Sequence, residues 1–144
     1  MKRPWLVMIC VTVFFIGIVA GVNLLLMKKI DLSNTQRLII NFEFWERPRV
    51  HTEVTDPKDF ENLIRICSGT ANNGLGCSVP SCGFGSVELI FETEYETIKI
   101  YPACDTCDTM RLGEENKFFY GIEDDKRVEL EGILKKYGIE FPCV

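Results

Sequence analysis

Residues 5–27 read WLVMICVTVFFIGIVAGVNLLLM, and this stretch contains no charged residue. A helix of this length spans roughly 34 Å at about 1.5 Å per residue, whereas the hydrocarbon core of a bilayer is about 30 Å thick. Its apolar side chains would cover every side of the helix, while an amphipathic core helix keeps a polar face. Trp5 at one end and Lys28 and Lys29 at the other suit the two membrane interfaces. The stretch therefore predicts a transmembrane helix, with the lipid bilayer as the partner of residues 5–27.

A cleaved signal peptide is the competing interpretation, with Lys2 and Arg3 as its charged start. The apolar run is longer than the usual ~7–15 residues of such a signal. Ala20 offers the best cleavage site, but Ile18 occupies a position where a small residue is preferred. Cleavage there would also leave an exposed apolar tail. We therefore expect an uncleaved signal-anchor in residues 1–29, a polar linker in residues 30–36 and one folded domain in residues 37–144.

The predicted domain carries a net negative charge. Lys2 and Arg3 are two of the 16 basic residues and the only charged residues before position 28. Residues 28–144 therefore carry 14 basic and 21 acidic side chains, a net charge of −7. Nucleic-acid binding requires clustered cations, so we expect no nucleic-acid partner.

Seven cysteines are many for a chain of 144 residues. Cys10 lies inside the predicted anchor, where we expect it to fill space as a small apolar side chain. An even number in a small domain behind a membrane signal is typical of a disulfide framework in an oxidising compartment. The flanking charges favour a cytoplasmic N-terminus only slightly, so the cysteines are the main reason to expect the domain outside the cytoplasm. The disulfide candidates are Cys67, Cys77, Cys82, Cys104, Cys107 and Cys143.

The first part of the domain has the pattern of a β-hairpin and a helix. Residues 38–45 and 50–54 alternate between apolar and polar side chains, the period of a strand, and a turn with Pro48 separates them. Asp56 followed by Pro57 is typical of a helix start, with an N-cap carboxylate and a proline in the first turn. The predicted apolar stripe of this helix consists of Phe60, Leu63, Ile64 and Cys67.

The second part of the domain alternates again. Residues 87–91 and 98–101 predict another hairpin, residues 110–112 a short strand, and residues 117–122 the last strand. Residues 123–137 predict a second helix, because acidic residues stand at its start and lysines at its end. The order β-β-α-loop-β-β-β-β-α predicts an α+β fold behind the transmembrane helix. In this fold two helices pack on one face of a small antiparallel sheet, and disulfides staple the domain.

The long irregular segment 68–84 is rich in glycine and contains two cysteines. A loop of this length in a small domain is usually functional or disordered, and binding residues are often found on loops held by a rigid scaffold. Together with residues 103–108 it is the predicted contact surface. The residues proposed for contact are Asn72, Asn73, Leu75, Val79, Phe84, Asp105 and Thr106.

Cys104 and Cys107 have the spacing of a thiol-disulfide oxidoreductase motif. Such a motif needs a lowered thiol pKa, usually at a helix N-terminus. Here Asp105 and Asp108 place negative charge beside the thiols, and the residues that follow predict strand or loop. We therefore expect a structural disulfide, with a redox protein of the cell envelope as an alternative.

A zinc site is the second alternative for the cysteines. Cys77 and Cys82, together with the Cys104–Cys107 pair, have the two-knuckle form of a four-cysteine site. Thiolates outside the cell oxidise, which favours disulfides over zinc. The zinc hypothesis therefore applies to a domain that faces the cytoplasm.

No catalytic, cofactor-binding or metal-binding residue is predicted. His51 is the only histidine, and the sequence has neither a Gly-x-Ser-x-Gly motif nor a sign of an activated thiol with which it could act. The sequence also contains no phosphate-binding loop and no H-E-x-x-H motif. We therefore expect a non-enzymatic binding or structural role at the cell envelope, with an unknown protein or envelope ligand as partner.

Overall fold

The computed structural model describes residues 8–9, 11–14, 17, 27–73, 83–105 and 107–141. Within these residues the chain forms one eight-stranded antiparallel sheet with helices, which confirms the predicted α+β class. The strands are β1 (Met27–Ile30), β2 (Thr35–Phe42), β3 (Val50–Glu53), β4 (Gly69–Asn72), β5 (Val87–Thr93), β6 (Thr97–Pro102), β7 (Thr109–Leu112) and β8 (Phe118–Gly121). The domain helices are α2 (Pro57–Cys67) and α3 (Asp124–Lys136).

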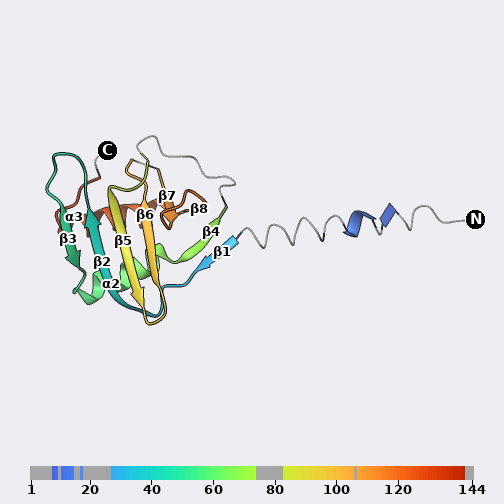
Figure 1. Ribbon diagram of the computed structural model, residues 1–144, viewed down its shortest axis with the longest axis horizontal. Coiled ribbons are helices and arrows are strands. Elements are labelled where there is room, and N and C mark those ends of the chain that lie inside the picture. Colours follow the sequence, from blue (N-terminus) through green and yellow to red (C-terminus); the bar gives the residue numbers. More distant parts are fainter. Residues whose placement is uncertain are drawn as a thin grey trace, which may run out of the picture.

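The strands lie in the order β1-β4-β8-β7-β6-β5-β2-β3, so β1 and β3 form the two edges of the sheet (Figure 1). The four strands β5 to β8 follow one another as neighbours. The β2–β3 hairpin extends this meander on one side, and the β1–β4 pair extends it on the other. Helix α2 joins β3 to β4 and therefore carries the chain from one side of the sheet to the other.

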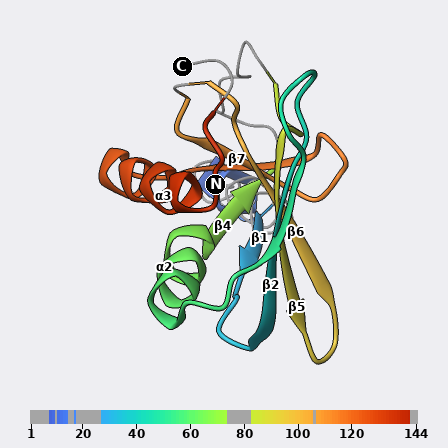
Figure 2. The same cartoon turned by 90° about the vertical axis from the view of Figure 1, so that its left-hand side faces the viewer.

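The core lies between the sheet and the two helices. Ile40, Leu89, Ile100 and Leu112 stand opposite one another on four adjacent strands and are buried. Helices α2 and α3 cover this inner face, and both lie on the same side of the sheet (Figure 2). The helices contribute Leu63, Ile66, Leu130, Ile133 and Leu134 to the same core.

Helix α2 begins as predicted. The Asp56 carboxylate accepts hydrogen bonds from the backbone N–H groups of Lys58 (2.9 Å) and Asp59 (3.0 Å), and Pro57 occupies the first turn. Leu63 and Cys67 of the predicted stripe are buried. Phe60 and Ile64 are only half-buried, because the helix turns Ile66 into the core instead.

The predicted linker, residues 30–36, differs from the structure. Residues 27–30 form β1, which pairs with β4, and both Ile30 and Leu32 are buried in the core. The polar residues of this segment make a turn: the Asp31 carboxylate accepts from the Ser33 N–H, and the Thr35 N–H donates to the Leu32 carbonyl. The polar composition therefore reflects a tight turn between two strands, and the folded part begins at the end of the predicted anchor.

The predicted loop 68–84 also contains regular structure, because its first residues form β4. This strand pairs along its length with β1 and at Asn72 with Phe119 of β8. Gly69 lies beside the Tyr120 ring, and a Cβ atom at this position would be in ordinary contact with the ring at 3.5 Å. Residues 74–82 lie outside the described residues.

Among the described residues of the predicted anchor, 8–9, 11–14 and 17 are helical, whereas residues 27–29 belong to strand β1 and not to a helix. Among the residues that the structure describes, no helix is both long and apolar enough to cross a bilayer. The remainder of the predicted span lies outside those residues, so the anchor stays a prediction.

Leu32→Ala should lower the free energy of unfolding by about 2–5 kcal/mol, because truncating a leucine in a packed core leaves a cavity. Val128→Ala is the matched control, since this α3 side chain is 68% exposed, and its effect should stay within about 0.5 kcal/mol. Urea unfolding of both variants beside the unchanged chain measures the two losses. Equal losses would show that residues 30–36 are a linker after all.

Candidate functional site

A row of polar side chains crosses the outer face of the sheet, which the helices leave open. We call His51, Asn41, Glu88, Tyr101 and Arg111 the polar row. Asn41 stands opposite His51 on β3 and Glu88 on β5, and Tyr101 on β6 stands opposite Arg111 on β7. These strand positions alternate with the buried positions of the inner face, so the same register that builds the core assembles the row.

Glu88 is the centre of the polar row. Its carboxylate accepts hydrogen bonds from the Tyr101 hydroxyl (2.7 Å) and the Asn41 amide (2.7 Å), and the Lys99 ammonium lies 3.2 Å away. Burial alone would raise the pKa of Glu88, but these three donors outweigh it and lower the pKa. Burial and the Glu88 charge raise the pKa of Tyr101 to about 12. At neutral pH the row therefore holds an ionised Glu88 and a protonated Tyr101.

The hydrogen bonds also fix the orientation of His51. Asn41 donates its amide N–H to Glu88, so its Oδ1 atom faces the Nδ1 atom of His51 at 2.6 Å. Because Asn41 Oδ1 can only accept, Nδ1 of His51 must carry the hydrogen. The Nε2 atom of neutral His51 is then an acceptor, and the side chain is exposed. The polar row thus ends in the imidazole of His51, and the hydrogen bond with Asn41 fixes the position of this ring.

A hollow of about 330 Å³ opens beside this end of the row. Among its lining residues are Asn41, His51, Glu88 and Tyr101 of the polar row and Glu43, Arg49, Gly85 and Ser86 around them. Arg49 forms an ion pair with Glu43, and the Glu43 N–H donates to the Ser86 carbonyl. The hollow therefore presents hydrogen-bond donors and acceptors held by neighbouring strands.

The other end of the polar row is aromatic. The Arg111 guanidinium lies 4.4 Å from the centre of the Tyr101 ring and 5.4 Å from that of Phe84. Phe84 in turn packs on Phe119, with 5.6 Å between ring centres. Arg111 donates to Asn116 (3.0 Å), while no hydrogen-bond partner among the described residues reaches its buried Nε atom. These contacts hold the guanidinium between two aromatic faces.

The predicted contact residues fall into three groups. Asn72 and Phe84 are half-buried and lie at the aromatic end of the outer face, and Asn73 is exposed. Asp105 is buried, so its side chain does not form part of an open surface. Leu75, Val79 and Thr106 lie outside the described residues.

The last residues of segment 68–84 lie next to the first residues of segment 103–108. Phe84 forms a β-bridge with Ala103, and the Cys104 N–H donates to the Gly83 carbonyl at 3.1 Å. The polar row itself was not predicted from the sequence. Its signal was the coincidence of Asn41, Glu88 and Tyr101 on the polar positions of three strands, which becomes visible only once the pairing of the strands is known.

Arg127 holds the loop that carries Cys104 and Cys107. Its guanidinium is buried and donates to the carbonyls of Ala103 (3.2 Å), Asp105 (2.6 Å) and Cys107 (3.3 Å). It also stacks over the Phe141 ring at 4.1 Å. This one side chain therefore ties the loop to helix α3.

The described cysteines are free thiols, which differs from the expected disulfide staple. Cys67 and Cys104 are buried, Cys107 is half-buried, and none of the three forms a disulfide in the structure. The expected Cys104–Cys107 bond is absent, and Arg127 holds this loop through its carbonyls. Cys77, Cys82 and Cys143 lie outside the described residues, so their pairing stays a prediction.

The Cys107 thiol is not activated. The hydrogen bond with the Asp105 side chain raises its pKa most, and burial raises it further, while Arg127 lowers it only in part. Burial raises the pKa of the Cys67 thiol as well. A reactive thiol needs the opposite environment, with a depressed pKa.

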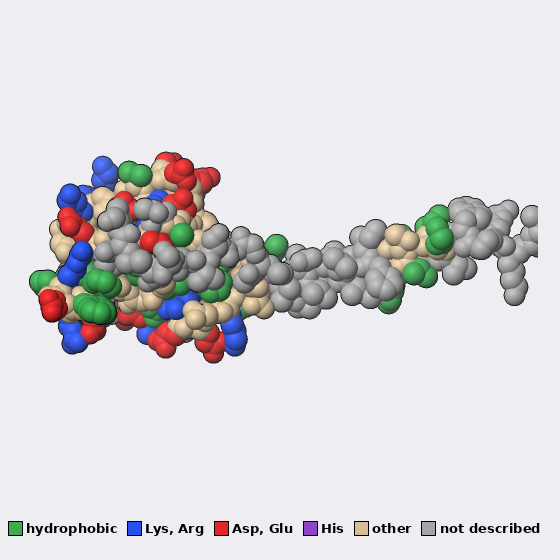
Figure 3. Space-filling view, turned by 90° about the horizontal axis from the view of Figure 1, so that it is seen from above, with side chains coloured by type: hydrophobic (Ala, Val, Ile, Leu, Met, Phe, Trp, Pro, Cys, Tyr) green, Lys and Arg blue, Asp and Glu red, His purple; other side chains and the backbone are tan. Residues whose placement is uncertain are grey.

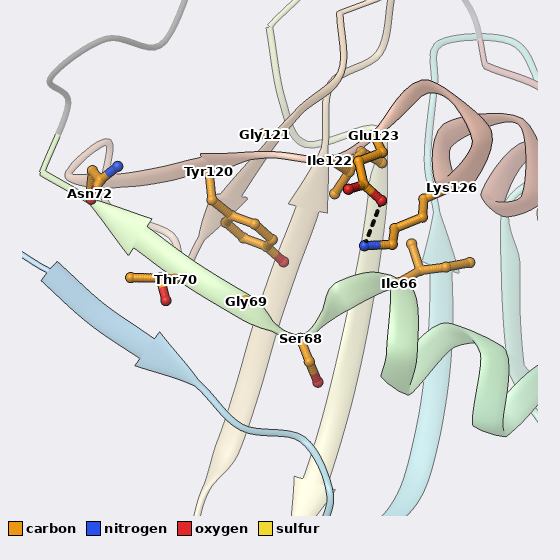
Figure 4. Close-up of a pocket in the computed structure, with 10 residues that line it drawn as sticks. All are labelled: Ile66, Ser68, Gly69, Thr70, Asn72, Tyr120, Gly121, Ile122, Glu123 and Lys126. Carbon is orange, nitrogen blue, oxygen red and sulfur yellow. Dashed lines mark ion pairs between the residues drawn. The ribbon is translucent and has the colours of Figure 1, made fainter.

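A second hollow of about 380 Å³ lies between α2, β4, β8 and the start of α3 (Figure 4). Glu123 and Lys126 form an ion pair across its rim at 3.0 Å. The Tyr120 side chain points from β8 toward Ser68, and its hydroxyl donates to the Cys67 carbonyl at 2.8 Å. We interpret this hollow as a place where these elements pack together, because the Tyr120 hydroxyl at its centre binds the carbonyl group at the end of α2.

Tyr101→Phe should lower the free energy of unfolding at neutral pH by on the order of 1.5 kcal/mol, because a hydrogen bond to a charged acceptor is lost. Folding lowers the pKa of Glu88, so its hydrogen bonds stabilise the fold at pH values above the range in which glutamate ordinarily titrates. This stabilisation is lost as the pH falls through the pKa that Glu88 has in the folded chain. The difference from the unchanged chain should therefore shrink below about pH 4. Tyr95→Phe is the matched control, because that ring is 85% exposed. A loss that is the same at every pH would contradict an ionised Glu88 as the acceptor.

Asp105→Asn should speed the alkylation of Cys107 several-fold at neutral pH, because it removes the carboxylate whose hydrogen bond is the largest cause of the raised thiol pKa and whose charge raises it further. Mass spectrometry of the Cys107 peptide after timed iodoacetamide treatment measures the rate. Cys67 is the internal reference and should stay unreactive in both chains while they are folded, since it is fully buried. Rapid alkylation of Cys107 in the unchanged chain would favour the redox alternative.

Comparison of the chain with protein-family models, with curated proteins and with solved structures finds no match. The polar row, the hollow beside it and the cysteine loop are therefore the features from which a function can be inferred.

Proposed function

We propose that this chain is a single-pass membrane protein that presents a small binding domain outside the cytoplasm. Residues 5–27 would lie in the bilayer, and the domain that begins at β1 would contact an envelope ligand or protein. The outer face of the sheet, around the hollow at His51, would be the main contact surface. The role would be binding rather than catalysis.

The exposure of the N-terminal apolar side chains carries the membrane part of the proposal. Met8, Val13 and Phe14 are 73%, 63% and 67% exposed, and they lie in the helical part of the predicted anchor. Leaving such a set in water is unfavourable by about 25 cal/mol per Å² of apolar surface. The Thr12 hydroxyl donates to the Met8 carbonyl at 2.8 Å, which satisfies the polar group inside the helix. A lipid environment would bury these side chains without leaving a polar group unpaired.

The pre-organised hollow supports the binding part. Its polar groups are held by bonds between β2, β3, β5 and β6 before any ligand arrives. Ordering these side chains therefore adds little to the cost of binding. The hollow is lined by groups that suit a polar ligand, and the predicted contact residues Asn72 and Phe84 lie on the same face.

The charge pattern supports a partner other than nucleic acid. Residues 28–144 carry a net charge of −7. Acidic and basic side chains lie next to one another over the face of the domain in Figure 3. Lys99 illustrates this mixing, because it pairs with both Glu88 and Glu114. A phosphate backbone would instead favour a continuous basic surface.

The two alternatives receive less support. An envelope redox protein would need an accessible thiol of low pKa, whereas Cys104 is buried and the pKa of Cys107 is raised. A zinc-stabilised domain would need Cys104 and Cys107 to meet further ligands. Among the described residues, no group of three metal-binding side chains comes together. Cys77 and Cys82, which that hypothesis also requires, lie outside those residues.

Membrane extraction tests the proposal. The full chain should stay in the membrane pellet at alkaline pH, whereas a chain that begins at Met27 should be released, because the apolar stretch is then missing. Protease added to the outside of intact cells should digest the domain of the full chain. Release of the full chain by alkali would overturn the anchor. Protection from external protease, with digestion after lysis, would place the domain on the cytoplasmic side.

A further inference from the structure

The edge strand β3 presents open backbone groups. The Val54 N–H donates to the Leu38 carbonyl (2.9 Å), which makes these two residues a hydrogen-bonded pair of the β2–β3 ladder. Such pairs alternate along an antiparallel ladder, so Thr52 and Val50 also bond to β2. His51 and Glu53 therefore direct their N–H and C=O groups away from the sheet. Within the described part of the chain, no other segment bonds to these four groups.

The β3 edge is short and carries Glu53, but it has no lysine, proline or bulge, which are the other devices that keep an edge strand from pairing with another strand. β3 reads VHTE, and its register with β2 is continuous. Figure 1 shows β3 at the left margin of the sheet. The opposite edge differs, because β1 contains Lys28 and Lys29 and follows the predicted anchor directly.

The β3 strand is complementary to itself. An antiparallel pairing of two copies centred on Thr52 places His51 opposite Glu53 of the partner subunit, and Glu53 opposite His51 of the partner subunit. All four outward backbone groups of each strand then find partners within β3. Val50 meets Val54 of the partner subunit on the inner face. A two-fold contact requires a self-complementary surface of this kind.

We propose that a second copy of this chain adds to the β3 edge in this register. The two-fold axis passes beside Thr52, and the two sheets become one continuous antiparallel sheet. Because the axis is perpendicular to the sheet, the helices of both copies lie on the same face. The polar rows of the two copies then lie end to end on the outer face.

The contact would also complete the hollow beside His51. Arg37 donates to the Oε2 atom of Glu53 at 2.9 Å, and Asn41 holds the Nδ1 atom of His51. This leaves the Oε1 atom of Glu53 and the Nε2 atom of His51. In the dimer, the Oε1 atom of one copy faces the Nε2 atom of the other copy across the contact between the two β3 strands. Each hollow therefore gains a carboxylate from the partner subunit at its open side.

This pairing takes His51 in its doubly protonated form, because Nδ1–H already donates to Asn41 and Nε2–H must donate to the carboxylate. The charged and titratable groups that line the hollow with His51 are Glu43, Arg49, Glu88 and Tyr101.

A cysteine at position 52, beside the two-fold axis, tests the proposed register directly. Opposite residues at such a position have Cα atoms about 4.5 Å apart, within the range of a disulfide. The full-length Thr52→Cys chain in lipid vesicles should form a covalent dimer under mild oxidation, with a peptide that joins the two introduced cysteines. Thr70→Cys is the matched control, since this outer-face residue on β4 is exposed and far from β3 in the sheet. Equal cross-linking of the two variants, or of the unchanged chain, would overturn the proposal.

Charge exchange tests the contact without cysteines. Glu53→Lys should weaken dimerisation of the full chain about tenfold, because two attractive cross-strand pairs become repulsive. Glu92→Lys is the matched control, since Glu92 also pairs with Arg37 but lies on the central strand β5. The double variant His51→Glu with Glu53→Lys restores opposite charges and should recover the dimer. Sedimentation equilibrium in detergent measures each constant. A monomeric unchanged chain, or a dimer that Glu53→Lys leaves intact, would overturn the proposal.

Discussion

The pairing register of β2 and β5 determines both faces of the sheet. Ile40 lies opposite Leu89 in the core, and the next pair along, Asn41 and Glu88, lies opposite each other on the outer face. Because side chains alternate with a period of two, a slip of one residue in either strand would exchange its faces. A slip of β5 would move Glu88 into the core and expose Leu89 to water. A slip of β2 would do the same with Asn41 and Ile40. The energy that fixes the core therefore also fixes the polar row.

The elements that were predictable from the sequence are those whose signal is local. The alternation of β2 and β5 and the Asp56–Pro57 start of α2 each lie within about ten residues of chain, a span in which period and capping can be read directly. The strands β1 and β4 have no such signal, because each has four residues and the two pair across about forty positions of chain. Leu32 shows the same limit, since a single leucine in a polar turn gives no sign that it is buried.

The site was predictable only in part, for a related reason. Polar residues on the outer positions of a strand have the pattern of a solvated face, and nothing in the order of residues indicates that Asn41, Glu88 and Tyr101 bond to one another. The meeting of the two loops at Phe84 and Ala103 was predictable, because both flank the same predicted hairpin. Asp105 was placed on the contact surface because it lies in a loop, yet it is buried in the loop that Arg127 closes.

Arg127 changes what the cysteines imply about compartment. The sequence argument placed the domain outside the cytoplasm because a small domain with six cysteines would need oxidation to hold its loops. In the structure the guanidinium of Arg127 binds three carbonyls of the 103–107 loop and stacks on Phe141, while Cys104 and Cys107 are free. Removing that side chain would leave three carbonyls without their donor, at a cost of about 1–3 kcal/mol for each one that stays buried. The three described thiols are free, and Arg127 binds the loop that carries two of them. In the proposed membrane protein, the side on which the domain would lie then rests on the orientation of the apolar stretch and on Cys77, Cys82 and Cys143, which lie outside the described residues.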